Sequence, residues 1–373
     1  MSAQRPLLFP TLLGFCKRLL LLSLLLLLFL FLFLLLYTFK NNNKKMSAEV
    51  VGPTLAAQLV VDAKAHLGEA PFWDSRRGEL LWLDILGAQV FQYNPSKGTN
   101  AVQDLSSHTA HVTTIAPVEG TDSAVVLGTS EGFLLLDLED ASVQAHAANG
   151  SLHGKHTRMN DGKCDPQGRL WIGSIAREGP DGADIVPGGA ALYVLDGWAS
   201  MPTKVLEGVS VSNGITWSKD GQTMYYTDSP TFGVDAFAFD GAAATHSQLA
   251  TQRRRCIDVC AGFPPVPDGC ALDADGKLWV ACFGAGQVRR YDPTTGTLLA
   301  TVLLPAEAGL ETTACAFGGP DLDELYVTTA HEFWSEEKLA QMPLAGGLFR
   351  VPREELAKLG SPIRGLPMHT FKR

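Results

Sequence analysis

Residues 80–95 read LLWLDILGAQVFQYNP, and residues 278–293 repeat the same pattern as LWVACFGAGQVRRYDP. Each stretch begins with an apolar run that contains a tryptophan, passes through a turn that contains glycine, and continues into a second run that ends in Asn-Pro or Asp-Pro. Short apolar runs joined by turn residues are typical of paired antiparallel strands. The two stretches therefore predict the same strand pair at two places in one chain.

The strand pair recurs at four other places, over residues 124–137, 170–196, 224–237 and 325–351. The six centres of the first strands lie 44 to 55 residues apart, which is the size of a propeller blade. A two-sheet sandwich is the alternative. It does not explain why an Asp-x-x-Gly or Asp-Gly turn recurs before the strands, at residues 165–168, 220–221 and 275–276. We predict an all-β fold, a six-bladed β-propeller in which six units close a ring.

Polar residues recur at one position of this repeat. They precede the centre of the next apolar strand by 11 or 13 residues, and they are Glu69, Asn160, Asn213 and Asp268. The same position in the other two blades is held by Thr113 and by the pair Thr312-Thr313. Equal position in a radial repeat means equal distance from the axis, so we expect these side chains at one mouth of the central channel. Carboxylate, amide and hydroxyl oxygens suit calcium, magnesium or manganese. The alternative is that Asn213-Gly214 and Asp268-Gly269 are ordinary turns.

A different segment precedes the repeat. Residues 19–37 read LLLLSLLLLLFLFLFLLLY, without a charge, and nearly suffice to span a hydrocarbon layer of about 30 Å. A cleaved signal peptide is the alternative, but its apolar core usually runs about 7–15 residues and ends at a small-residue site. We divide the chain into a flank at 1–18, a transmembrane signal anchor at 19–39, a linker at 40–60 and the propeller at 61–373. This predicts a single-pass membrane protein, facing the secretory side or, as a form starting at Met46, cytoplasmic.

The charge is distributed unevenly along the chain. The first 45 residues hold six of the 30 basic residues and no acidic residue, so the remainder carries 24 basic against 39 acidic residues, a formal charge of −15. An acidic domain repels nucleic acid and attracts cations. We therefore expect no nucleic-acid partner.

Five motifs, in chain order, resemble the signatures of one family. They are His66-Leu67-Gly68-Glu69-Ala70-Pro71-Phe72-Trp73, Arg158-Met159-Asn160-Asp161-Gly162-Lys163, Ser212-Asn213-Gly214-Ile215-Thr216-Trp217, Pro267-Asp268-Gly269-Cys270 and Cys315-Ala316-Phe317-Gly318-Gly319. Together they resemble the regucalcin, gluconolactonase and luciferin-regenerating-enzyme family, also called the senescence-marker-protein family. The resemblance covers residues 66 to about 352.

The resemblance implies roles for individual residues. Glu69, Asn213 and Asp268 match the family's ligands for one divalent cation, which is calcium, zinc, manganese or magnesium. Asp268 also matches the catalytic acid/base. The residues that match substrate contacts are Arg158, Asn160 and Glu178, although the loop around Glu178 differs. Met159 replaces the usual aromatic residue, and Ser212 stands where many members have proline, so the substrate pocket is expected to differ.

These roles predict a metal-dependent hydrolase that opens sugar lactones, of the gluconolactonase type. A cation polarises the lactone carbonyl and lowers the pKa of water, Asp268 transfers the proton, and the five donors of Arg158 orient the sugar together with Asn160. One alternative is an esterase or organophosphatase that acts on other esters. Another is a calcium-binding regulatory protein without turnover, which would gain nothing from Arg158. A strictosidine-synthase-like propeller would lack the acidic pair.

Overall fold

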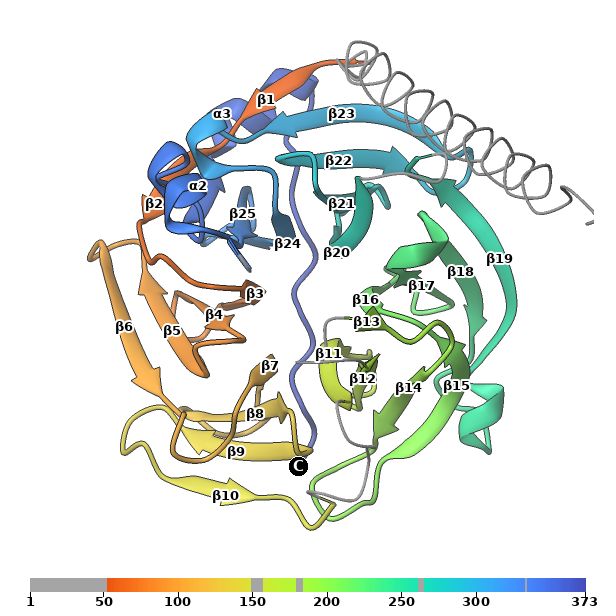
Figure 1. The fold of residues 1–373 in the computed structure, drawn as a ribbon. Helices are drawn as coiled ribbons and strands as arrows, with labels where there is room; N and C mark the ends of the chain where they lie inside the picture. The colour runs from red at the N-terminus through yellow and green to blue at the C-terminus, as the bar shows by residue number, and fades with distance from the viewer. Residues whose placement is uncertain (1–51, 149–156, 179–183, 261–264, 333) are drawn as a thin grey trace, which may run out of the picture. The chain divides into compact units, whose positions relative to one another are not determined.

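The computed structural model describes residues 52–148, 157–178, 184–260, 265–332 and 334–373. Six antiparallel sheets surround one axis, as Figure 1 shows. The innermost strands of successive sheets contact each other in the order β3, β7, β11, β16, β20, β24 and back to β3, so the ring is closed. The predicted six-bladed β-propeller is confirmed.

The blades are numbered here in chain order of their inner strands, and each is given from its inner to its outer edge. Blade one has β3 (Gly68–Asp74), β4 (Glu79–Asp84), β5 (Gln89–Asn94) and β6 (Thr99–Asp104). Blade two has β7 (Val112–Pro117), β8 (Ala124–Thr129), β9 (Phe133–Asp137) and β10 (Val143–Ala145). Blade three has β11 (Thr157–Cys164), β12 (Leu170–Glu178), β14 (Ala190–Leu195) and β15 (Thr203–Val209), with β13 (Asp184–Ile185) beside β12.

Blade four has β16 (Ser212–Trp217), β17 (Thr223–Asp228), β18 (Gly233–Phe239) and β19 (Ala250–Asp258). Blade five has β20 (Val266–Leu272), β21 (Leu278–Phe283), β22 (Gln287–Asp292), β23 (Thr297–Leu303) and β1 (Thr54–Ala56). Blade six has β24 (Thr312–Gly318), β25 (Glu324–Thr329), β26 (Leu348–Val351) and β2 (Gln58–Val61). A short helix, α2 (Glu336–Gln341), lies between β25 and β26 in the chain, and another, α3 (Arg353–Leu356), follows β26.

The predicted strand pairs are the two middle strands of each blade. Trp82, Trp171 and Trp279 of these strands are fully buried in the core between blades, and Trp217, the last residue of the inner strand β16, is nearly so. Two of them are fixed by the aspartate of the recurrent turn, because Nε1 of Trp171 donates to Asp165 at 2.8 Å and Nε1 of Trp279 donates to Asp273 at 3.0 Å. The turn therefore supplies the acceptor that a buried indole needs.

Strands β1 and β2 complete the outer edges of two blades. β1 runs parallel to β23, and β2 pairs antiparallel with β26. Both strands include residues of the linker expected at 40–60, so this boundary was wrong: the propeller takes up the chain from Thr54 onward. Neither strand is strongly apolar on both faces, so neither forms the continuous apolar run from which the middle strands were predicted.

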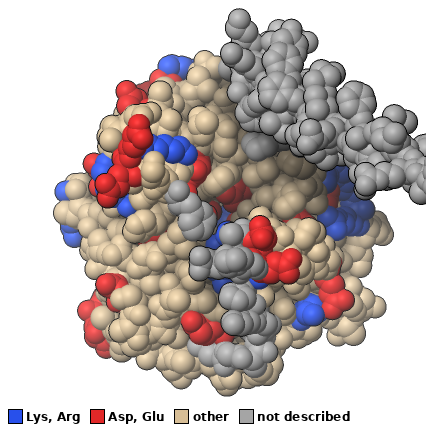
Figure 2. Space-filling view, viewed as in Figure 1, with Lys and Arg blue, Asp and Glu red and all other residues tan. Residues whose placement is uncertain are grey.

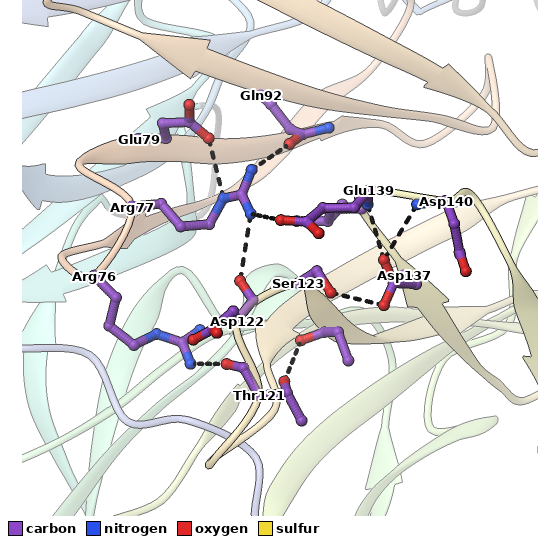
Figure 3. Close-up of polar contacts among 12 residues, drawn as sticks. Arg76, Arg77, Glu79, Gln92, Thr121, Asp122, Ser123, Asp137, Glu139 and Asp140 are labelled. Atoms are coloured by element: carbon purple, nitrogen blue, oxygen red, sulfur yellow. Dashed lines mark hydrogen bonds and ion pairs between the residues drawn. The ribbon is translucent and has the colours of Figure 1, made fainter.

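Polar contacts join blades one and two where β3 turns into β4 (Figure 3). Nη1 of Arg77 donates to the backbone oxygen of Asp122 at 3.3 Å and lies 4.0 Å from Glu139. The neighbouring Arg76 donates to the backbone oxygen of Thr121. These contacts lie beyond the ends of the inner strands, at the face opposite their starts.

A segment after α3 crosses that same face, and Figure 1 shows it passing over the centre of the ring. The backbone nitrogen of Gly365 donates to Leu322 at 2.7 Å, and that of Phe371 donates to Pro117 at 2.8 Å. Phe371 is fully buried. The crossing segment therefore closes one end of the channel and leaves the starts of the inner strands at the other.

The expected membrane anchor at 19–39 lies outside the described residues. Within the part of the chain that the structure describes, no helix is long and apolar enough to cross a membrane. Figure 2 shows acidic side chains dispersed over the face that it draws, with a small basic area at one side. The prediction of no nucleic-acid partner rests on this acidic balance.

Candidate functional site

Every inner strand carries a register shift close to its start. The shifts lie between Glu69 and Phe72, Val112 and Thr114, Met159 and Gly162, Ser212 and Ile215, Pro267 and Cys270, and Thr312 and Cys315. Five of the predicted polar positions lie inside these irregularities, namely Thr113, Asn160, Asn213, Asp268 and Thr313, and Glu69 borders its own. A β-bulge turns a side chain out of the alternating pattern of its strand. The equal spacing in the sequence therefore corresponds to an equal place in six blades.

Two glycines allow neighbouring bulges to approach one another. A Cβ atom on Gly214 would lie 2.5 Å from the backbone oxygen of Asp268, and one on Gly269 would lie 2.5 Å from Cβ of Ala314. Both distances are too short for real contacts. Asn213 and Asp268 are thus held on adjacent strands that only glycine allows to pack this closely.

A chain of hydrogen bonds crosses blades three, four and five. Nη1 of Arg158 donates to Oδ1 of Asn160 at 2.6 Å, and Nδ2 of Asn160 donates to Oδ1 of Asn213 at 2.8 Å. Nδ2 of Asn213 then donates to Ser229 at 2.7 Å, and this hydroxyl donates to the backbone oxygen of Pro267 at 2.6 Å. The predicted residues Arg158, Asn160 and Asn213 are therefore in contact, and the chain ends one residue before Asp268.

Two buried carboxyl groups complete the site, with Glu69 6% and Asp268 7% exposed. Burial, followed by the nearby Asp161, raises the pKa of Glu69 from 4.5 to about 8. Burial, followed by Glu69 and Asp161, raises the pKa of Asp268 well above its usual range. Oδ1 of Asp268 is buried and has no hydrogen-bond partner among the described residues. Three acidic groups thus lie near one another, and the charges of Arg158 and Lys163 compensate their negative charge only in part.

The donor set fits a hard divalent cation. Glu69, Asn213 and Asp268 offer oxygen atoms from three blades, and Oδ1 of Asp268 is buried without a hydrogen-bond partner among the described residues. Among the described residues, no three His, Cys, Asp or Glu side chains converge as a metal site would require. A cation here would therefore depend on the amide oxygen of Asn213, which is common for calcium.

The family described as "SMP-30/Gluconolactonase/LRE-like region" matches this chain over residues 67–331, a range that contains all of these residues. The chain belongs to this family. It is 36% identical over 318 residues to regucalcin from Oryctolagus cuniculus, which covers 85% of this chain and 99% of that protein. A Bacillus subtilis protein with the provisional name sugar lactone lactonase YvrE is 35% identical, over 80% of this chain and 95% of its own length.

Solved structures agree with this family assignment. A calcium-binding protein, regucalcin, from Agrobacterium tumefaciens has a TM-score of 0.73 and 26% identity, covering 87% of this chain and all of that one. A luciferin-regenerating enzyme has a TM-score of 0.71 and 28% identity, covering 85% of this chain and 99% of its own. The resemblance found in the five motifs is therefore confirmed over the whole propeller.

Glu178 is placed differently from the other predicted residues of this family site. It is the last residue of β12, its side chain is exposed, and its backbone pairs with Asp184 of β13. No contact among the described residues ties it to Arg158 or Asn160. Its role in substrate binding stays a prediction.

Several residues at the site were not predicted from the sequence. Asp161 and Lys163 follow Asn160 on β11 and lie deeper in the channel, where Lys163 donates to the backbone oxygen of Cys270 and lowers the pKa of Glu69 and Asp161. His111, which the sequence placed on the surface or in a loop, is half-buried, and burial, Arg158 and Arg177 lower its pKa. Asp161 and Lys163 are two residues apart on β11, so their side chains lie on the same side of the strand. This alternation is the sequence signal that could have identified them.

A cavity of about 450 Å³ lies at the other end of the same strands. Its lining includes Lys163, Trp217, Phe317 and, from the crossing segment, Leu366 and Met368. Most of these residues lie toward the ends of the inner strands, whereas Glu69 and Asp268 lie near the starts of theirs, and Lys163 lies between the two. The acidic groups that shift each other's pKa make the opposite end, where the inner strands begin, the candidate functional site.

Proposed function

We propose that this chain is a divalent-metal-dependent hydrolase that opens sugar lactones. The observation that carries the proposal is the buried pair Glu69 and Asp268, with an unpartnered oxygen of Asp268, beside the hydrogen-bonded Arg158 and Asn160. Relatives with the names gluconolactonase and sugar lactone lactonase support the substrate class.

Glu69, Asn213 and Asp268 would hold the cation, which is calcium, zinc, manganese or magnesium. When bound, it would polarise the ester carbonyl and lower the pKa of a water molecule. The buried position of Glu69 and Asp268 excludes bulk water, which strengthens every electrostatic interaction at this point.

The chain's own residues supply the proton transfer and the orientation. Asp268 accepts a proton from the attacking water on the carboxylate oxygen that would not hold the cation, and returns it to the ring oxygen as the C–O bond breaks. Arg158 presents donors that Asn160 holds in place, and these orient the sugar hydroxyls. The reaction consumes one lactone and one water molecule and gives one hydroxy acid.

A calcium-binding protein without turnover is the second candidate, and the solved relative that is titled a calcium-binding protein supports it. It would need the carboxylates but not the guanidinium of Arg158, which repels a cation. Hydrolysis of other esters, including organophosphates, is the third candidate and would use the same residues.

The three candidates separate in one assay. The full chain is stripped of metal and tested by release of acid against aldonolactones, a homoserine lactone, aryl esters and an organophosphate, with calcium, zinc, manganese or magnesium added back. Hydrolysis of aldonolactones above the other esters supports the proposal. Tight calcium binding without turnover of any ester would overturn it in favour of the regulatory protein.

We further propose that residues 19–39 anchor the chain in a membrane, with the propeller on the secretory side or, in a form starting at Met46, in the cytoplasm. The unbroken apolar run supports the anchor. Extraction at alkaline pH tests it: release of the full chain from membranes would overturn the proposal.

A further inference from the structure

One ion pair joins two blades that face each other across the channel. Nη2 of Arg177, near the end of β12 in blade three, lies 3.7 Å from Oε1 of Glu332, which follows β25 in blade six. Blades three and six are three steps apart in a ring of six. Both residues lie at the face where the inner strands begin. The pair therefore spans the mouth of the site that holds Glu69 and Asp268.

Among the described residues, the contact between Arg177 and Glu332 is long and leaves Nε of Arg177 without a partner. Its side chain is 21% exposed and that of Glu332 is 14% exposed, so both are largely withdrawn from water. The 3.7 Å separation is longer than a hydrogen bond, and Nε of Arg177 is buried without a hydrogen-bond partner among the described residues. A guanidinium group has five donors in a planar fork that matches a carboxylate or phosphate with two parallel bonds. The guanidinium group of Arg177 can therefore still donate hydrogen bonds to an anionic group.

A second arginine lies beside it. Arg158 pairs with Ile175 across β11 and β12, and Arg177 comes two residues after Ile175, so both arginines project from the same face of the sheet. Arg177 is the charged neighbour that most lowers the pKa of Arg158, which falls to about 10, chiefly through burial. Arg177 also contributes to the lowered pKa of His111. Two like charges at the rim favour an anion between them.

Glu332 competes only weakly with an incoming anion for Arg177. It has an acidic neighbour, Glu311, whose pKa it helps to raise, and Glu311 has partners of its own in Trp334 and Lys338. Glu332 follows the end of a strand, where its side chain can turn toward solvent. An incoming anion that makes two hydrogen bonds to Arg177 would displace the single long contact to Glu332.

We propose that Arg177 is a specificity residue that binds an anionic substituent, a phosphate or a carboxylate, on the lactone, and that Glu332 holds its side chain across the mouth until such a substrate enters. The inference rests on the proposed function and narrows its substrate class. It predicts that the chain prefers an acidic lactone over its neutral counterpart.

Turnover is compared for 6-phosphoglucono-δ-lactone against glucono-δ-lactone, and for glucaro-1,4-lactone against glucono-1,4-lactone. The expected result is a kcat/KM at least about tenfold higher for the anionic member of one pair. Preference in the first pair assigns a phosphate and preference in the second a carboxylate. Equal kcat/KM within both pairs overturns the inference and leaves lactone hydrolysis intact.

Two substitutions and a control assign the preference to the ion pair. Arg177→Gln is expected to raise KM for the preferred anionic lactone about tenfold more than for the neutral one. Arg177→Lys is expected to retain part of the preference for the anionic lactone. Glu332→Gln is expected to lower KM for the anionic lactone. Arg353→Gln removes an exposed arginine on α3 that forms an ion pair with Glu354, and it should change neither value. Equal effects of Arg177→Gln on both lactones would overturn the assignment.

A binding measurement keeps the inference independent of catalysis. Calorimetry compares the binding of gluconate with that of 6-phosphogluconate to the full chain. A second titration compares gluconate with glucarate, in which the additional anionic group is a carboxylate. Tighter binding of the anion-bearing acid, lost in Arg177→Gln, supports the inference even if no lactone is hydrolysed. If the unmodified chain binds gluconate as tightly as it binds both 6-phosphogluconate and glucarate, which carry an additional anionic group, the inference is overturned.

Discussion

Nδ2 of Asn160 donates a hydrogen bond to Oδ1 of Asn213 over 2.8 Å, and so joins the inner strands of blades three and four inside the site. The bond orients the side-chain amide of Asn213, whose nitrogen donates to Ser229. It also joins two roles, because Asn160 holds Arg158 with its other amide atom. Orientation of a ligand by a neighbour typically changes metal affinity by about 10–100-fold when the neighbour is lost.

Asn160→Leu is accordingly expected to weaken binding of calcium or manganese by about tenfold or more, because the amide oxygen of Asn213 then loses the donor that orients it. Isothermal titration of the metal-free chain measures this. Gln144→Leu, an exposed position on β10, serves as the control. Unchanged affinity in Asn160→Leu would show that Asn213 is oriented by Ser229 alone.

Asp268→Asn is expected to reduce lactone hydrolysis by at least about a thousandfold, since the amide cannot accept the proton from water. The fold should persist, and the metal-free variant should be no less stable than the parent, because one uncompensated buried carboxyl is removed. Circular dichroism checks the fold and the acid-release assay checks the rate. Full activity in this variant would defeat the proposed mechanism.

The metal-free chain is expected to lose stability as the pH rises from about 5 to 8. Folding raises the pKa of Glu69 from 4.5 to about 8, so the folded state binds this proton more tightly than the unfolded state throughout that interval. Asp268 shifts in the same direction. Stability is therefore highest below the unfolded pKa, and it falls until Glu69 is ionised in both states. Calorimetric scans should show the melting temperature dropping by several degrees over this range.

Two controls define this pH effect. Glu69→Gln should flatten the dependence, and calcium at pH 8 should restore the lost stability by binding only the folded chain. A melting temperature that rises with pH in the metal-free chain would contradict the assignment of uncompensated buried acids.

Gly214→Ala is expected to destabilise the chain by about 1–3 kcal/mol, because the added methyl group would meet the backbone oxygen of Asp268 at 2.5 Å. The same displacement should weaken cation binding. Urea unfolding measures the first effect and titration the second. Gly197→Ala, whose Cβ would find its closest neighbour at 3.4 Å, is the matched control and should be close to neutral.

The sequence predicted those parts of the fold whose signal is local. The middle strands are continuous apolar runs around Trp82, Trp171 and Trp279, and their regular spacing implied a ring. The same regularity placed Glu69, Asn160, Asn213 and Asp268 at one level, and the shared bulges explain why it succeeded.

What was missed depends on chain packing rather than on local pattern. The contact between Arg177 and Glu332 exists only because two opposite blades face each other, and no spacing in the sequence encodes it. Strands β1 and β2 are short and largely exposed, so their membership of blades five and six appears only when the ring closes.

The return of β1 and β2 to the last two blades has a consequence for biogenesis. These strands leave the ribosome first, yet their partners β23 and β26 are made near the end of synthesis, so the nascent chain must keep Thr54–Ala56 and Gln58–Val61 available until then. The final edges of two blades therefore form together, after translation of the rest. A polypeptide initiated at Met46 retains both strands, whereas one that begins beyond Val61 would leave two blades with open edges and a tendency to aggregate.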